Sequence, residues 1–293
     1  MTGAQQSFGG DWTSEKLERV RKYLKAYTTV MNKQNFRFAY IDAFAGTGYR
    51  TLETSENDTN LLFPELAEQE SQTFIDGSAR IALEVQPRFS KYIFIECDPA
   101  RFAELEQLKT EYPLIRDDII LVNSDANDYV KELCLKRDWR RRRAVLFLDP
   151  FGMQVTWDTI EAVAQTRAID LWILFPLGVA VNRLIKKDGK ISETWRRKLD
   201  AMFGATDWYE AFYRPKVVKG LFGEESSMEK VSDFDFIGQY FVKRLKSLFA
   251  GVAENPLPLL NSKNNPLYLL CFASANPKGS TTAIKIAQDI LRR

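Results

Sequence analysis

Four acidic residues that end apolar runs are the side chains of this chain best suited to bind a ligand. The first, Asp42, follows the apolar run 38–41 and precedes a turn that contains Gly46 and Gly48. Two glycines one residue apart let the backbone turn sharply and let a ligand approach the main chain. An acid before such a turn disfavours a pyrophosphate and suits a ligand with an ammonium group or ribose hydroxyls. A plain glycine turn is the alternative interpretation.

The second and third apolar runs also end in acids. Glu96 ends the second run, where a carboxylate can accept hydrogen bonds from both ribose hydroxyls of a nucleoside. Asp98 is expected to cap the next helix, so Glu96 is the preferred ligand. Asp125 ends the third run and can accept from an adenine amine, while the backbone N–H of Ala126 donates to the ring. Asp125 can equally well cap a helix, and both interpretations remain open.

The fourth run ends at Asp149-Pro150-Phe151-Gly152. Proline has no N–H, so this turn presents carbonyl acceptors beside the Asp149 carboxylate, and Phe151 offers a face for stacking. Such a group can hold a planar base and accept both hydrogens of its exocyclic amine, which orients the nitrogen lone pair for attack on an electrophile. An ordinary Asp-Pro turn is the alternative.

The composition excludes several kinds of chemistry. The 293 residues include no histidine, which removes Ser-His-Asp and Cys-His nucleophiles and most zinc catalysis. Three cysteines far apart in the sequence indicate reduced core thiols and no metal site. The net charge of +2 neither requires nor excludes nucleic acid. Without a long apolar run or a signal peptide, the chain is expected to be cytoplasmic.

The elements that must position these acids alternate between strands and helices. This alternation predicts an α/β fold with a doubly wound, mostly parallel sheet, whose ligands gather at the carboxyl ends of the strands. An amphipathic helix over 14–31, capped by Ser14, is expected to cover the sheet. The other expected helices lie near 77–85, 98–108 and 157–166, and the expected strands near 38–41, 91–98, 118–125, 144–149 and 168–177.

Three regions are predicted. Residues 1–177 form the core, with an insertion at 50–76 that holds seven acids and one base and is a lid, a partner surface or a solvated loop. Residues 178–250 form a helical insertion, and 251–293 a closing hairpin and a last helix capped by Ser280. Basic and aromatic residues in the insertion suit phosphate contact and base stacking; a subdomain with an aromatic core is the alternative. The candidate phosphate ligands are Arg183, Lys186, Lys187, Arg196, Arg197 and Lys198.

Two of these motifs resemble motifs of known enzymes. The stretch YIDAFAGTG resembles the first motif of class I S-adenosylmethionine (SAM) methyltransferases, D/E-x-F-x-G-x-G. Asp149-Pro-Phe-Gly resembles the D/N-P-P-Y/F motif of amine-directed base methyltransferases, and more closely the D-P-F-G of tRNA guanosine dimethyltransferases. Its aromatic residue stands one place earlier than in D-P-P-Y, which leaves open which base edge is held. The first resemblance implies cofactor contacts from Asp42, Ala43, Phe44, Gly46, Thr47 and Gly48.

Nearly the whole chain resembles the three-Cys-motif partner proteins, a bacterial family with a methyltransferase-like fold. The segments that carry this resemblance include FIECDP, LDPFGMQVTW, AIDLWILFPLGVAVNRL, FGATDWYEAFY and YLLCFASANP. It implies SAM as cofactor and a radical-SAM-like partner with a three-cysteine motif. The sequence therefore predicts a SAM-dependent N-methyltransferase acting on an exocyclic amine of a DNA or RNA base. The alternative is a non-catalytic SAM-binding or scaffold subunit that serves the partner.

Overall fold

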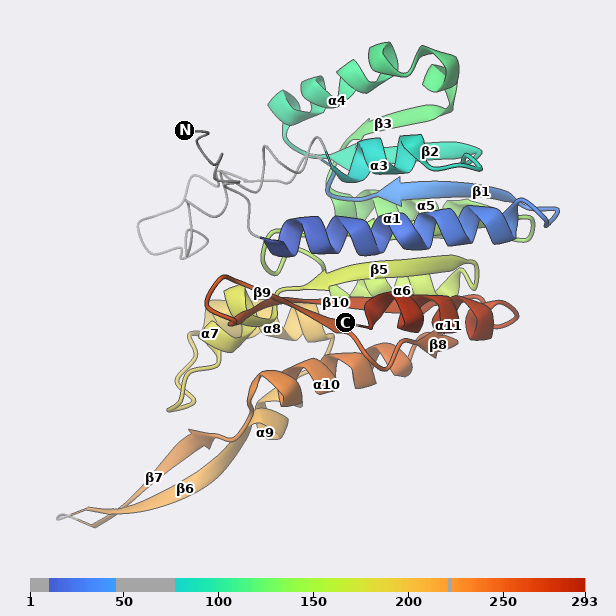
Figure 1. Ribbon diagram of the computed structural model, residues 1–293. Coiled ribbons are helices and arrows are strands. Elements are labelled where there is room, and N and C mark those ends of the chain that lie inside the picture. Colours follow the sequence, from blue (N-terminus) through green and yellow to red (C-terminus); the bar gives the residue numbers. More distant parts are fainter. Residues whose placement is uncertain (1–10, 46–76, 221–222, 293) are drawn as a thin grey trace, which may run out of the picture.

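An eight-stranded sheet organises the molecule, and five of its strands are parallel (Figure 1). The computed structural model describes residues 11–45, 77–220 and 223–292. The strand order is β3-β2-β1-β4-β5-β10-β8, with β10 antiparallel to β5 and β9 paired to β10. The strands are β1 (Arg37–Asp42), β2 (Lys91–Glu96), β3 (Ile119–Asn123), β4 (Arg142–Leu148), β5 (Ile169–Phe175), β8 (Gly251–Val252), β9 (Leu257–Leu260) and β10 (Pro266–Ser274).

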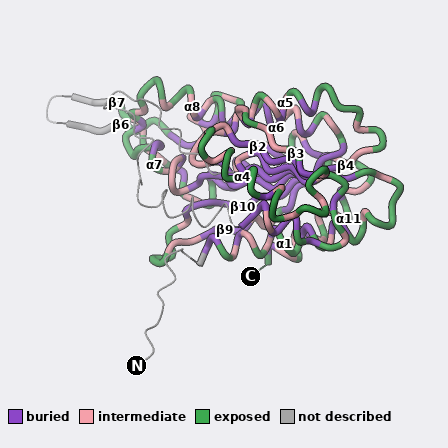
Figure 2. Tube along the Cα trace, turned by 90° about the horizontal axis from the view of Figure 1, so that it is seen from above, coloured by how far each residue is buried: buried purple, intermediate pink, exposed green. Residues whose placement is uncertain are grey.

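Helices cover both faces of this sheet, which is why β4 and β5 are almost entirely apolar. Successive side chains of a strand point to opposite faces, so Tyr40 joins one core and Ile41 the other. Figure 2 shows the buried strands between more exposed helices. One face packs against α1 (Asp11–Met31), α3 (Ser78–Glu84), α4 (Pro99–Glu111) and α11 (Ser280–Leu291). The other packs against α5 (Ala126–Lys136), α6 (Trp157–Gln165) and α10 (Phe234–Lys246).

Two helix starts differ from the prediction. Helix α1 begins at Asp11, so Ser14 lies within the helix and does not cap it. The extra turn is stabilised by burial of Trp12, whose ring stacks on Tyr268 with centroids 5.1 Å apart. Helix α11 begins at Ser280 itself, with Gly279 at the cap position and no side-chain capping bond.

The segment between β5 and β8 is less helical than predicted. A short turn, η3 (Leu177–Val181), leads into α7 (Asn182–Leu184), α8 (Glu193–Phe203) and α9 (Trp208–Phe212). An antiparallel hairpin then projects from the molecule (Figure 1), formed by β6 (Tyr213–Gly220) and β7 (Gly223–Lys230). These two strands pair only with each other. Tyr213, the first residue of β6, is buried, and Met228 of β7 packs against the core of the molecule.

The C-terminal hairpin is confirmed, because β9 and β10 pair antiparallel after the insertion. The predicted doubly wound α/β sheet, mostly parallel and closed by antiparallel strands, is therefore confirmed as well. A short 3₁₀ turn, η2 (Pro113–Asp118), joins α4 to β3. Among the described residues, no helix combines the length and apolar character needed to span a membrane.

Candidate active site at the carboxyl edge of the sheet

The strand register brings the predicted acids to one edge of the sheet. Asp42 is paired with Phe147, two residues before Asp149, and Glu96 is paired with Asn123, two residues before Asp125. The turn after β1 lies between its neighbours, because the Ala43 N–H donates to the Phe147 carbonyl at 3.1 Å.

The described part of that turn ends at Ala45, whose N–H donates to the Ile95 carbonyl at 3.0 Å. Phe44 is half-buried and packs against the core. The predicted cofactor residues Gly46, Thr47 and Gly48, and the acidic insertion 50–76, lie outside the described residues.

Asp42 is a buried acid with one oxygen available. Its Oδ2 accepts a hydrogen bond from the Tyr40 hydroxyl at 3.2 Å, whereas Oδ1 has no partner among the described residues. Burial, together with the negative charge of Asp149, raises the pKa of Asp42 to about 7, and neighbouring hydrogen-bond donors oppose that rise. A positively charged ligand group beside Oδ1 would satisfy this oxygen and favour the ionised acid.

Asp149 forms a buried ion pair with Lys16, a residue that the sequence reasoning missed. The Lys16 Nζ donates to Asp149 Oδ2 at 2.6 Å, and the two side chains are only 3% and 4% exposed. Burial raises the pKa of Asp149, while the charge of Lys16 and its hydrogen bond oppose that rise. Asp149 is thus not the open acceptor that the motif suggested, because one of its oxygens is already bound to a cation.

The sequence did contain a signal for Lys16. It stands four residues after Trp12 and four before Val20, so it lies on the buried stripe of the first helix and not on its solvent face. A lysine in an apolar stripe requires a buried partner. The prediction treated this helix only as a cover for the sheet.

The turn at 149–152 is held from two sides. The Phe151 N–H donates to the Gln154 side chain at 2.9 Å, and Gly152 has a φ of 65°, a conformation that favours glycine. Asn127, also missed, donates to the Gln154 carbonyl at 2.9 Å and accepts from the Thr156 N–H at 3.1 Å. These bonds fix the turn against the start of α5.

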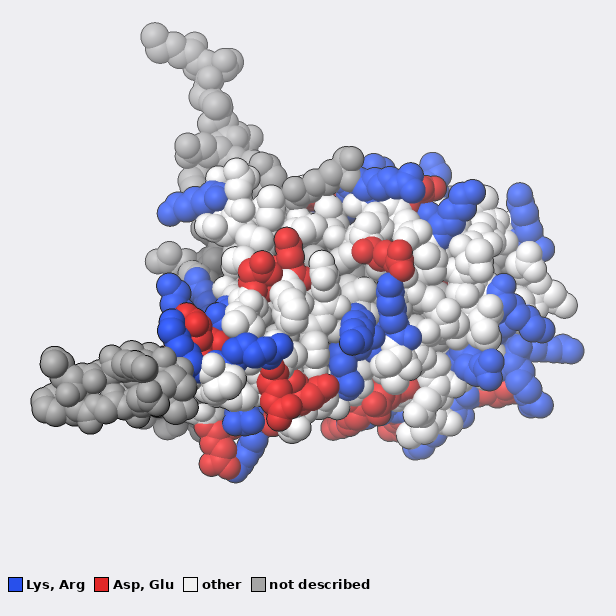
Figure 3. Space-filling view, turned by 90° about the horizontal axis from the view of Figure 1, so that it is seen from below, with Lys and Arg blue, Asp and Glu red and all other residues white. Residues whose placement is uncertain are grey.

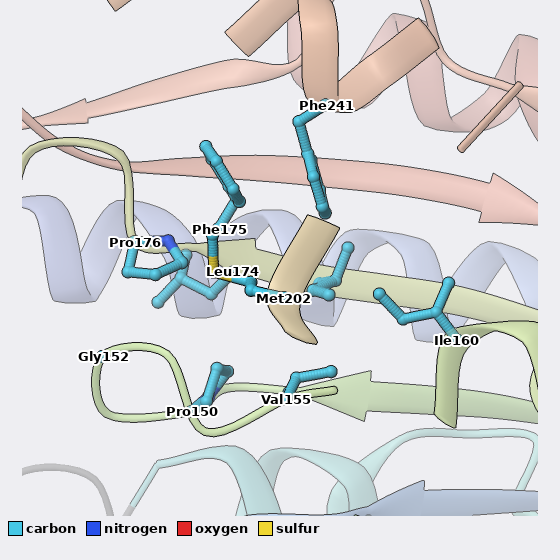
Figure 4. Close-up of a pocket in the computed structure, with 10 residues that line it drawn as sticks. Pro150, Gly152, Val155, Ile160, Leu174, Phe175, Pro176, Met202 and Phe241 are labelled. Atoms are coloured by element: carbon cyan, nitrogen blue, oxygen red, sulfur yellow. The ribbon is translucent and has the colours of Figure 1, made fainter. Parts of the chain in front are cut away.

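Behind this turn lies an apolar pit, shown in Figure 4, that Pro150 lines together with Phe175, Met202 and Phe241. The pit encloses only about 10 Å³, about the minimum needed for one water molecule. It therefore cannot hold a base. Pro150 packs the turn against Met202 of the insertion.

The other predicted acids accept hydrogen bonds from backbone N–H groups at helix starts or in loops. Asp98 caps α4, as predicted, because its Oδ1 accepts from the N–H groups of Ala100 and Arg101 at 2.9 and 3.0 Å. Glu96 is 3% exposed, and its Oε1 accepts from the Asp98 N–H at 2.7 Å.

Asp125 caps α5, since its Oδ1 accepts from the N–H groups of Asn127 and Asp128 at 2.9 and 3.2 Å. Asp125 therefore acts as a helix cap. A contact of adenine with Asp125 and with Ala126, the first residue of α5, stays a prediction.

The six predicted phosphate ligands lie on the segment after β5. Arg183 is in α7, Lys186 and Lys187 follow it, and the other three are in α8. In α8, the Arg196 guanidinium lies 4.5 Å from the Tyr209 ring centroid, Lys198 lies 4.6 Å from that of Trp195, and Arg197 pairs with Glu193. Figure 3 shows basic and acidic atoms interspersed on the face viewed from below. Phosphate binding by these cations stays a prediction.

Base stacking by most aromatic residues of this segment is ruled out by their burial. Phe203, Trp208, Phe212 and Tyr213 are at most 1% exposed and form the core of the insertion. The Trp208 indole N–H donates to Asp200 Oδ1 at 2.7 Å. The alternative interpretation, a subdomain with an aromatic core, is correct for these four residues. Trp195 and Tyr209 remain half-buried.

The strand order and the acidic carboxyl edge define a Rossmann-like α/β protein. No protein-family model matches the chain, and no curated protein matches it. The described residues contain no group of three or more acidic or cysteine side chains arranged to hold a metal ion.

Solved structures resemble the chain at low identity. Protein LPL1258 from Legionella pneumophila is 13% identical, with a TM-score of 0.48 over 97% of this chain and 92% of that protein. A putative rRNA methylase from Clostridium thermocellum is 11% identical, with a TM-score of 0.31 over 74% and 97%. Magnesium protoporphyrin IX methyltransferase from Synechocystis, solved with bound SAM, is 9% identical, with a TM-score of 0.32 over 78% and 85%. These similarities are too weak to assign an activity.

Proposed function

We propose that this protein is a SAM-dependent methyltransferase that acts on an exocyclic amine of a DNA or RNA base. The observation that supports this most is the set of carboxylates at one edge of the sheet, where Asp42 has a buried oxygen without a partner among the described residues. Ligands of doubly wound sheets bind at this edge. The sequence motif around Asp42 indicates SAM as the cofactor, and the motif around Asp149 indicates an amine as the methyl acceptor.

The residues present fit SAM. Asp42 Oδ1 suits the methionyl ammonium group, Glu96 suits the ribose hydroxyls, and Asp125 with the Ala126 N–H suits the adenine. When bound, SAM supplies a methyl group activated by a sulfonium. The chain itself then has to orient the acceptor nitrogen and exclude competing nucleophiles.

The Lys16–Asp149 pair supports a neutral amine as the acceptor. Lys16 stabilises the ionised form of Asp149, whose Oδ1 can accept a hydrogen bond from the acceptor amine while Oδ2 is bound to the lysine. The ammonium of Lys16 at this position repels a protonated aliphatic amine, which also has no free lone pair. The exocyclic amine of a base is neutral and can approach. Transfer of the methyl group would break its bond to the sulfonium and leave S-adenosylhomocysteine, and Asp149 or water would accept the proton that the methylated nitrogen loses.

A second candidate function is a non-catalytic SAM-binding or scaffold subunit for a radical-SAM-like partner with a three-cysteine motif. The occupancy of Asp149 Oδ2 by Lys16 favours it, since this bond can serve stability alone. The two candidates differ in one respect. A scaffold keeps SAM binding but transfers no methyl group to nucleic acid.

Titration calorimetry with SAM and with S-adenosylhomocysteine tests the cofactor. Both should bind, and Glu96→Ala should weaken binding about tenfold or more, because it removes hydrogen bonds to a charged acceptor worth about 1.5–3 kcal/mol each. Glu104→Ala, on the exposed face of α4, is the matched control and should bind like the wild type. Folded wild-type protein that binds neither compound would overturn both candidate functions.

A further inference from the structure

A second cavity lies at the opposite edge of the sheet from the acidic site. It encloses about 360 Å³ between α1, α11 and the amino ends of β4 and β5. Asp170, the second residue of β5, forms part of its wall, whereas the proposed active site lies beyond the other ends of these strands. A volume of this size accommodates a small organic molecule.

The deep wall of this cavity is negative and pre-organised. Asp170 is 7% exposed, and its two oxygens accept hydrogen bonds from the Tyr23 hydroxyl at 2.8 Å and the Ser274 hydroxyl at 2.6 Å. These bonds hold the carboxyl group in place. An anion would be repelled here, while ring N–H or amino groups of a ligand would find acceptors.

The Tyr27 hydroxyl is a buried group for which a ligand would provide a partner. Tyr27 lines the cavity and is 7% exposed, and its hydroxyl makes no hydrogen bond among the described residues. Its ring is stacked on Phe89, with centroids 6.0 Å apart and planes at 18°, so the hydroxyl is held where it is. Buried hydroxyl groups normally have a partner, and an unpaired one at a cavity wall marks a place where a bound molecule can donate or accept.

The mouth of the cavity is positive. The Arg143 guanidinium lies 4.0 Å from the Phe36 ring centroid, and its Nη1 donates to the carbonyls of Trp139 and Arg142 at 3.1 and 2.7 Å. Arg143 is therefore fixed, with Nε and Nη2 donating to no group among the described residues. Lys278 lines the same mouth just before the N-terminus of α11, which also favours an anion.

We propose that this cavity binds a planar aromatic molecule with one anionic group, of the size of a nucleoside monophosphate. The ring lies against Tyr27 and Phe36, with its polar edge towards Tyr27 and Asp170. The phosphate or carboxylate lies at the mouth and pairs with Arg143 and Lys278. Such a ligand would contact α1, α11 and the sheet at once. Helix α1 also supplies Lys16 to the proposed active site.

Calorimetry on the whole chain tests this site with two kinds of anionic aromatic molecule, nucleotides and an aromatic carboxylate. The probes are the four nucleoside 5′-monophosphates and 4-aminobenzoate, each up to 5 mM, with the corresponding nucleosides and inorganic phosphate as controls. At least one anionic probe should bind, and removing its anionic group should weaken binding tenfold or more. Arg143→Gln should weaken binding by a similar factor, whereas Arg141→Gln, at the exposed neighbouring position, should change it less than twofold.

Two further variants show where the probe binds and whether a loss of binding is caused by misfolding. Lys278→Gln, at an exposed position, should weaken the probe severalfold even where Arg143→Gln disturbs folding. Glu96→Ala, at the other edge of the sheet, should leave probe binding unchanged, so failure of the proposed methyltransferase site would not affect this result. The proposal is overturned if no anionic probe binds, if binding survives both cation substitutions, or if Glu96→Ala abolishes it.

Discussion

Replacing Lys16 by methionine should destabilise the fold in a pH-dependent manner. At 2.6 Å and an effective dielectric constant of about 20, the attraction between Lys16 and Asp149 is about 6 kcal/mol before the cost of desolvation is subtracted. Methionine keeps most of the side-chain volume but leaves Asp149 buried beside Asp42 without a cation. Breaking a buried pair in this way costs about 3–5 kcal/mol, and we expect a loss in that range at pH 8.

The sign of the pH dependence follows from Asp149. Burial raises the pKa of this acid even with Lys16 present, and without the lysine its folded-state pKa rises further. An acid whose folded-state pKa exceeds its unfolded-state value stabilises the fold at low pH and loses that contribution as the pH rises through the folded-state value. The penalty of Lys16→Met should therefore be smaller at pH 5 than at pH 8.

Urea unfolding of four proteins measures this effect. They are the wild type, Lys16→Met, Asp149→Asn and the double variant, each at pH 5 and pH 8. The double variant should be more stable than Lys16→Met at pH 8, because it no longer buries an unpaired charge. Lys22→Met, at an exposed position on α1, is the control and should cost less than about 1 kcal/mol. A loss below about 1 kcal/mol for Lys16→Met, equal at both pH values, would refute the buried-pair reasoning.

Two other perturbations test the electrostatics of the molecule. Asp42→Asn should gain stability relative to the wild type by about 3 kcal/mol between pH 5 and pH 8. The pKa of Asp42 is raised from 3.8 to about 7, and about two of these pH units lie above pH 5, where the wild type loses about 1.4 kcal/mol per unit. A difference that does not vary with pH in urea unfolding would contradict the raised pKa. Reversing Arg196, Arg197 and Lys198 to Glu should weaken nucleic acid binding at constant SAM affinity. The slope of the logarithm of the binding constant against the logarithm of the salt concentration should become shallower by about one unit per lost phosphate contact. An unchanged slope in filter-binding assays would mean that these cations only cover the insertion.

The sheet and its acidic edge could be predicted from the sequence, because fully buried strands are continuous apolar runs that end where the chain reaches solvent or a ligand. The Asp98 cap could be predicted as well, because it depends on local spacing. Contacts between distant segments were not accessible in this way. Lys16 and Asp149 are 133 residues apart, and only the packing of α1 on the sheet brings them together.

The insertion shows a different limit of sequence reasoning. Its aromatic residues fit a core or a base-stacking surface equally well until burial distinguishes the two, as it does for Trp208. The β6–β7 hairpin was not predicted, because its strands form a separate two-stranded sheet and lack the continuous apolar run of a strand buried on both faces. Asn127 was missed because its hydrogen bonds link the start of α5 to the loop after β4, and the two segments meet only in the folded structure.

Methyl transfer to nucleic acid is the central claim, and nucleoside mass spectrometry tests it most directly. The protein is incubated with SAM carrying a trideuterated methyl group and with total RNA or DNA from cells that lack it, and the nucleosides are then analysed. The account predicts a deuterated N-methyl nucleoside with the wild type and at least a hundredfold less with Asp149→Ala, whose SAM affinity stays nearly unchanged. SAM binding without any deuterated nucleoside, or equal amounts from both proteins, would contradict it.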